Sequence, residues 1–103
     1  MRNPPQTDST ALPEAPRDSV LLERLAAGDR QALADLLGRY GASLYALAFA
    51  ILPDSGEAQA IVDSTFREAR WEARHFHPHH YPVSRWLAEV TRQAAVERRR
   101  ART

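Results

Sequence analysis

The chain has 103 residues, a formal net charge of +1 and no cysteine. This length suits one small domain with a single core, and the lack of cysteine excludes a disulfide framework, a thiolate metal site and a cysteine nucleophile. The N-terminus has no apolar signal core, and the longest apolar run, residues 44–52, is too short to span a bilayer. We therefore expect a cytoplasmic protein without a membrane partner.

The N-terminal part is predicted to contain a tail and one short helix. Residues 1–16 hold four of the seven prolines and little large apolar surface, so we expect a disordered tail. Residues 17–103 are predicted to form one helical domain. In its first helix Asp18 is the expected capping residue, closely spaced apolar side chains follow, and Gly28 is placed to end the last turn.

A second predicted helix is the longest periodic segment. Asp29 is expected to cap it and Pro53 to end it. Its apolar side chains recur at steps of three and four residues and predict a buried stripe: Leu33, Leu36, Leu37, Tyr40, Leu44, Leu47, Ala48 and Ile51. Residues 53–56 read Pro-Asp-Ser-Gly and predict a turn, because Pro fixes φ, Asp and Ser bond nearby backbone donors, and Gly tolerates positive φ.

A third helix is predicted directly after this turn. One of its faces is expected to be buried: Ile61, Val62, Thr65, Phe66, Ala69, Ala73 and Phe76. Pro78 and Pro82 exclude a continuous helix beyond it, and Ser84 or the residue before it is the expected cap of a fourth. No strand or hairpin pattern competes along the sequence. We therefore predict an all-α fold, a compact bundle of about four helices.

The basic character of the chain is confined to its C-terminal part. There are eight Arg and eleven acidic residues through Ser84, but six Arg and only two acidic residues from Arg85 onward. On a helical wheel of the fourth helix, one side is apolar: Leu87, Val90, Thr91 and Ala94, with Trp86 at the edge. The opposite side is cationic, with an arginine every seven residues: Arg85, Arg92 and Arg99.

The loop before this helix is rich in rings: His77, His79, His80 and Tyr81. Rings stack on unpaired bases while arginines follow phosphates, so the loop and helix together predict a site for one nucleic-acid strand. A solvated surface without a ligand is the alternative. The four histidines at 75, 77, 79 and 80 also raise a metal hypothesis, but no cysteine is present and no carboxylate lies closer in sequence than Glu72 and Glu89. We expect no metal and no cofactor.

An enzyme is not expected. The serines lie in no nucleophile-elbow context, no glycine-rich phosphate loop is present, and the carboxylates fall on exposed helical positions rather than forming an inward-facing pair.

Four segments, taken in order, resemble region two of an extracytoplasmic-function (group four) sigma factor of bacterial RNA polymerase. They are LERLAAGDRQAL at 22–33, Tyr40 with LYALA at 44–48, Ile61-Val62 with Thr65-Phe66, and Trp86-Leu87 followed by TRQAAVE at 91–97 and an arginine run. The resemblance covers residues 20–102.

This resemblance implies two surfaces. The helix from Glu57 to Arg74 would dock on the clamp helices of the largest subunit of RNA polymerase core, through Glu57, Gln59, Asp63, Arg67 and Glu68. The segment from His75 to Arg100 would recognise and melt the minus-ten promoter element and hold a flipped base of the non-template strand. Its implied DNA-binding residues are His77, His79, His80, Tyr81, Arg85, Trp86, Arg92, Gln93 and Arg99. Gln93 stands where the family usually has Asn.

Departures from the family pattern keep a second interpretation open. Gln59-Ala60 and Asp63-Ser64 flank the two aliphatics of the third helix, so two expected carboxylates are missing, and the family's Trp is displaced by one position to Trp71. The alternative is a sigma-like interaction module, a decoy or regulator that binds an anti-sigma factor without opening a promoter. A complete factor of this class has a second DNA-binding domain, and the sequence ends at Thr103, so we expect either an isolated domain or a one-domain relative.

Overall fold

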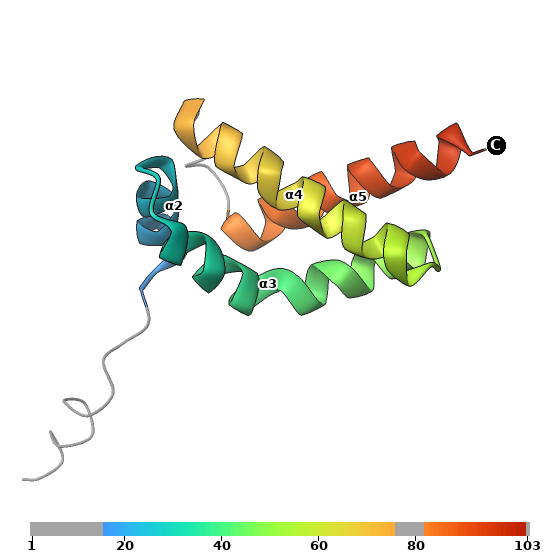
Figure 1. The fold of residues 1–103 in the computed structure, drawn as a ribbon, viewed down its shortest axis with the longest axis horizontal. Coiled ribbons are helices and arrows are strands. Elements are labelled where there is room, and N and C mark those ends of the chain that lie inside the picture. The colour runs from blue at the N-terminus through green and yellow to red at the C-terminus, as the bar shows by residue number, and fades with distance from the viewer. Residues whose placement is uncertain (1–15, 76–81, 103) are drawn as a thin grey trace, which may run out of the picture.

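The structure, a computed structural model, describes residues 16–75 and 82–102 (Figure 1). These residues form four helices, α2 (Asp18–Ala26), α3 (Arg30–Ile51), α4 (Ser55–His75) and α5 (Val83–Ala101). The described part contains no strand, which confirms the predicted all-α bundle. None of the described helices is both long and apolar enough to cross a membrane. The predicted tail, apart from Pro16, lies outside the described residues.

The three long helices all pack against one another. α4 crosses α5, α3 contacts both, and α2 packs at one end against α3 and α4 (Figure 1). The main core joins side chains from all four helices: Leu21, Leu25, Leu36, Leu44, Val62, Phe66, Trp86 and Leu87. A second, smaller cluster contains Ala48, Leu52, Ala58, Ile61 and Ala95. This packing sets the angle between α4 and α5, the two helices predicted to carry function.

The buried face of α4 agrees with the predicted stripe. Its residues from Ile61 to Ala73 that were expected inside are all buried, and Ala58 joins them, while Phe76 lies outside the described residues. Two hydroxyl groups, those of Thr65 and Thr91, are fully buried between α4 and α5 and lie 2.8 Å apart. Thr65 donates its proton to the carbonyl of Ile61 at 3.0 Å. Because each hydroxyl has one proton, Thr91 is the donor to Thr65.

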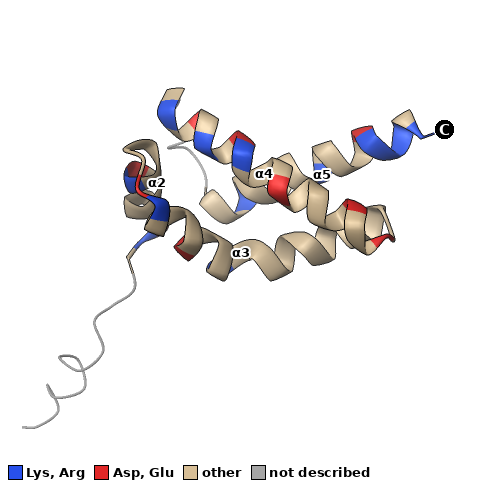
Figure 2. Cartoon of the chain, viewed as in Figure 1, with Lys and Arg blue, Asp and Glu red and all other residues tan. Residues whose placement is uncertain are grey.

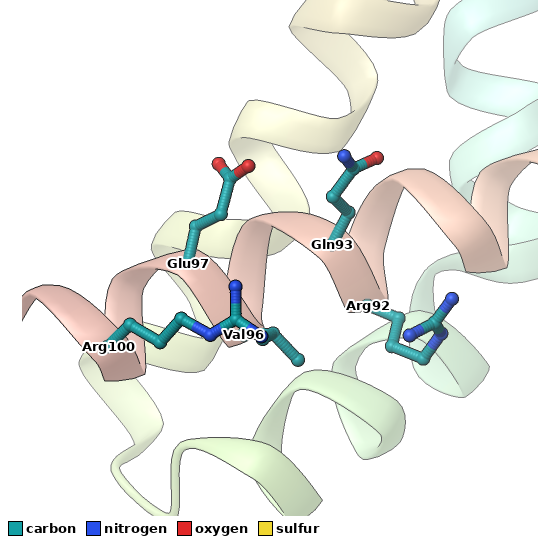
Figure 3. Close-up of a pocket in the computed structure, with 5 residues that line it drawn as sticks. All are labelled: Arg92, Gln93, Val96, Glu97 and Arg100. Atoms are coloured by element: carbon teal, nitrogen blue, oxygen red, sulfur yellow. The ribbon is translucent and has the colours of Figure 1, made fainter.

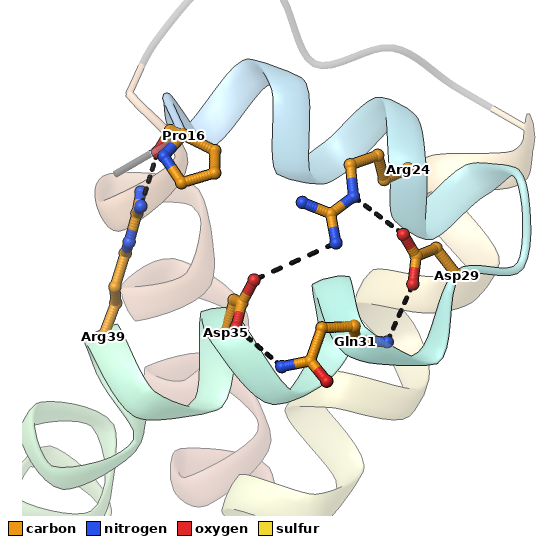
Figure 4. Close-up of polar contacts among 6 residues, drawn as sticks. All are labelled: Pro16, Arg24, Asp29, Gln31, Asp35 and Arg39. Atoms are coloured by element: carbon orange, nitrogen blue, oxygen red, sulfur yellow. Dashed lines mark hydrogen bonds and ion pairs between the residues drawn. The ribbon is translucent and has the colours of Figure 1, made fainter. Parts of the chain in front are cut away.

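The junction of α2 and α3 is held by the Asp29 side chain (Figure 4). As predicted, this carboxylate caps α3: it accepts from the backbone N–H of Gln31 at 2.8 Å, and also from Nε of Arg24 at 2.7 Å. The Arg24 hydrogen bond first, and that from Gln31 second, hold the pKa of Asp29 below its usual value. Gly28 has φ of 91°, the left-handed conformation that ends a helix.

The prediction that Asp18 caps α2 is wrong. The N-cap is Arg17, which makes no side-chain capping bond. The Asp18 carboxylate instead accepts from Nη1 of Arg39 at 2.7 Å and from the hydroxyl of Tyr40, both on α3. Arg39 also bonds the carbonyl of Pro16 (Figure 4). An ion pair between a guanidinium and a carboxylate is charge-assisted on both sides, so Asp18 ties α2 to α3.

Two other predicted boundaries are displaced. Ser55 and Gly56 already belong to α4, because the Asp54 side chain accepts from the backbone N–H of Glu57 at 2.9 Å and starts the helix there. The connection is therefore shorter than the predicted turn. α5 begins at Val83 with Pro82 as N-cap and no side-chain capping bond, so Ser84 lies inside the first turn and does not cap it.

One residue of the predicted α3 stripe is misplaced. Leu37 is 39% exposed, while the preceding Leu36 is fully buried. Successive helical positions are separated by a rotation of about 100°, so Leu36 in the core turns Leu37 toward solvent.

Candidate nucleic-acid interface

α5 has two sharply different faces. Its inner face is buried through Val83, Trp86, Leu87, Thr91 and Ala95. Trp86, expected at the edge of this face, is only 4% exposed. Its ring belongs to the main core and supports α5 from inside, so the described structure offers no indole surface there for a base to stack on.

The outer face of α5 exposes the predicted arginines, Arg85, Arg92 and Arg99. Within residues 16–75 and 82–102, no carboxylate pairs with these three guanidinium groups. Residues seven apart on a helix are separated by about 10 Å along its axis. Arginines therefore recur along the exposed side of α5 (Figure 2), and this spacing suits a chain of phosphates.

Two other arginines near the end of α5 pair with a carboxylate of α4. Arg102 donates through Nη1 to Oε1 of Glu57, and Nε of Arg98 lies 3.8 Å from Oε2 of the same carboxylate. Glu57 was predicted to contact polymerase, but its side chain faces α5 and is only 24% exposed. No local sequence pattern indicates this pairing, because it joins residues 45 positions apart.

A shallow pocket lies on the outer face of α5 (Figure 3). It has a volume of about 360 Å³ and is lined by Arg92, Gln93, Val96, Glu97 and Arg100. Gln93 and Glu97 stand one helical turn apart and point to the same side (Figure 3). An amide can bond the edge of adenine and a carboxylate can accept from the amino group of cytosine, while Arg92 can hold a phosphate. Glu97 was not among the predicted site residues.

The outward face of α4 carries the other predicted surface. Gln59, Asp63, Arg67 and Glu68 are all exposed, and Gln59 donates to Asp63 at 3.0 Å. A shallow pocket of about 480 Å³ is lined by Ser64, Arg67, Glu68 and Trp71. The four residues that line this pocket therefore share one side of α4, whereas Glu57 lies in the first turn of the helix and pairs with Arg98 and Arg102.

Trp71 is the most exposed large apolar residue recorded for the described part, at 52%. Its ring stacks on that of His75 with centroids 4.2 Å apart. Sequence reasoning gave Trp71 no site role, although its spacing of three and four residues from Glu68 and Arg67 places all three on one face. An exposed indole beside a carboxylate and a guanidinium is typical of a protein-interaction surface.

Glu68 also lies beside a second carboxyl group. Burial, followed by the hydrogen bond and the negative charge of Glu68, raises the pKa of Glu72. Glu72 therefore holds its proton more firmly than an isolated glutamate does. The surface is nevertheless mixed in charge, since Arg67, Arg70 and Arg74 share the exposed side of α4.

The predicted loop of histidines and a tyrosine is not part of the described structure. His77, His79, His80 and Tyr81 lie outside the described residues, so their role in a base pocket stays a prediction. The metal alternative involves the three loop histidines together with His75, the last residue of α4. Among the residues that are described, no three His, Asp or Glu side chains group as metal ligands.

Comparison of the sequence with protein-family models gave no match, and comparison with curated proteins gave none either. A solved structure does match: the NMR structure of the complex formed by an engineered region 2 of sigmaE with GTAAAA. The TM-score is 0.75 and the sequence identity is 28%, and the match covers 87% of this chain and 93% of the other.

Proposed function

We propose that this chain binds RNA polymerase core and recognises and melts the minus-ten promoter element. The chain has the sigma factor region 2 fold, and its likeness to sigmaE confirms its resemblance to an extracytoplasmic-function sigma factor. The observation that carries this proposal is the outer face of α5. Guanidinium groups that pair with no carboxylate of the described residues recur along it, and Gln93 and Glu97 line a pocket beside Arg92.

The chemistry of this face fits one strand of promoter DNA. Arg85, Arg92 and Arg99 would hold successive phosphates, and hydrogen-bonding side chains between them would meet base edges. The neighbouring structure is a complex with GTAAAA, which supports a similar ligand here. Extruding a base from the duplex costs a few kcal/mol, which stacking and edge hydrogen bonds must recover. We assign that task to the His77, His79, His80 and Tyr81 loop.

Polymerase binding is assigned to the exposed face of α4. Gln59, Asp63, Arg67 and Glu68 remain the proposed contacts, and the structure adds Trp71 beside them. A carboxyl pair next to an exposed indole suits basic side chains of a partner, through ion pairing and cation–π contact. We propose the clamp helices of the largest subunit of polymerase core as that partner.

The decoy interpretation has one observation in its favour. The family's acidic surface is reduced on α4: two expected carboxylates are absent from the sequence, and a third, Glu57, is paired with α5. A module that binds an anti-sigma factor needs no polymerase contact. This function is kept as the second candidate.

The salt dependence of binding to a single-stranded oligonucleotide containing GTAAAA tests the proposal. Each phosphate contact contributes a slope of about 0.7 to the plot of log K against log salt concentration. Replacing Arg92 and Arg99 by Ala should flatten that slope by about 1.4. The matched control is Arg30→Ala with Arg74→Ala, which removes two exposed arginines from other helices. Equal slopes for the two double variants would contradict the assignment of α5.

A further inference from the structure

Glu57 pairs with two arginines near the C-terminus of the chain. It lies in the first turn of α4, and Arg98 and Arg102 approach it from the last turns of α5. The glutamate side chain is 24% exposed, whereas the two arginine side chains are 49% and 53% exposed. The Glu57 side chain is thus partly covered, while both arginine side chains remain open to solvent.

These ion pairs contribute little to the stability of the fold. Ion pairs with exposed partners contribute little to folding, because water screens the charges and two long side chains lose freedom. The start of α4 already has its capping bond from Asp54. The Glu57 pairing therefore calls for a second explanation.

Two guanidinium groups that converge on one carboxylate also suit a phosphate. Arg98 and Arg102 are four residues apart and share one side of α5, and arginine forks bond carboxylate and phosphate oxygens with similar geometry. Arg98 also lines a groove of about 450 Å³ between α4 and α5, together with Arg67 and Glu97. The two arginines outweigh the one carboxylate, so an anion can approach Arg98 from this groove.

We infer that Arg98 and Arg102 form a phosphate site that the Glu57 carboxylate occupies in the free domain. Glu57 then competes with nucleic-acid phosphate and restricts firm backbone contact to Arg85, Arg92 and Arg99. The biological meaning of this inference rests on the proposed function, because it supposes a nucleic-acid ligand. The site itself consists of Arg98 and Arg102, which can bind any polyphosphate.

The test compares Glu57→Gln with Glu23→Gln. Both remove one negative charge, but Glu23 is exposed on α2 and is remote from the end of α5. The ligands are a single-stranded oligonucleotide containing GTAAAA and inorganic polyphosphate. Glu57→Gln should bind both more tightly than Glu23→Gln does. For the oligonucleotide, two added contacts would steepen the salt slope by about 1.4, or about sevenfold more loss between 50 and 200 mM salt.

A second pair of variants keeps the inference testable if Glu57→Gln does not fold. Arg98→Gln with Arg102→Gln should weaken oligonucleotide binding much less than Arg92→Gln with Arg99→Gln, because Glu57 already neutralises the first pair. In the Arg98→Gln and Arg102→Gln background, Glu57→Gln should have no added effect. Circular dichroism establishes which variants are folded.

Three outcomes would overturn the inference: equal effects of the two glutamate variants, a Glu57→Gln gain that persists without the two arginines, or equal losses in the two double-arginine variants. The inference and the proposed function fail separately. A domain that ignores the oligonucleotide but gains polyphosphate affinity with Glu57→Gln would retain the phosphate site and lose the promoter assignment. Oligonucleotide binding that is unaffected by Glu57→Gln would keep the promoter assignment and rule out the phosphate site.

Discussion

The buried hydroxyl pair of Thr65 and Thr91 yields a prediction about how α4 and α5 are held together. Thr65→Val removes the group that accepts from Thr91, and leaves the Thr91 hydroxyl fully buried without that partner. Loss of a partner for a buried donor costs about 1–3 kcal/mol. Thr91→Val should cost less, about 1 kcal/mol, because Thr65 still donates to Ile61.

The double variant separates this explanation from a simple loss of packing. With both hydroxyls replaced by methyl groups, no buried donor remains unpaired, and stability should return toward that of the wild type. The two single effects should therefore not add, with a coupling of about 1 kcal/mol or more. Urea unfolding followed by circular dichroism measures this, with an unchanged m-value showing that both end states are preserved.

An exposed hydroxyl provides the control. Ser43→Ala on the solvent side of α3 should change stability by less than about 0.5 kcal/mol. Additive losses for Thr65→Val and Thr91→Val would refute the reasoning, since they would mean that each hydroxyl acts independently of the other. The pair matters for function because α4 and α5 carry the two proposed surfaces.

Three further predictions follow from the described contacts. Asp29 has a lowered pKa in the folded state, so its ionised form stabilises the fold above the unfolded pKa, and this contribution is lost as the pH falls through the folded pKa. The stability gap between wild type and Asp29→Asn in thermal unfolding should accordingly narrow from pH 7 to pH 3; a constant gap would contradict this. Trp86→Ala should cost about 3–5 kcal/mol in urea unfolding, because the ring is buried. Trp71→Ala should cost about 1 kcal/mol or less but weaken polymerase binding, since that indole is exposed; unchanged retention on polymerase would remove Trp71 from the surface.

Features set by neighbouring residues were predictable from the sequence. The apolar spacing of α4 identified its buried face, because helical geometry alone brings residues three and four apart together. Asp29 and Gly28 were placed correctly for the same reason, since a cap and a helix end depend on local backbone groups. The exposed cationic side of α5 likewise follows from its seven-residue arginine spacing.

Features that depend on distant partners were not predictable. Asp18 was expected to cap α2, but its partners in the structure, Arg39 and Tyr40, lie more than 20 residues away in the sequence. Glu57 was assigned to polymerase, yet α5 brings Arg102 to it. The burial of Trp86 depends on how the helices around α5 pack, which a helical wheel of one helix does not contain. Side-chain partners across the bundle thus decide which residues of the two proposed surfaces are free.

The retention of purified bacterial RNA polymerase core by this domain tests the central claim most directly. We expect the wild-type domain to retain RNA polymerase core. Replacing Asp63 and Glu68 by Ala should reduce this retention and leave oligonucleotide binding intact. Loss of both activities together would indicate unfolding, which circular dichroism would detect. No retention by a domain shown to be helical and folded would contradict the account, and would favour a sigma-like regulator with a different protein partner.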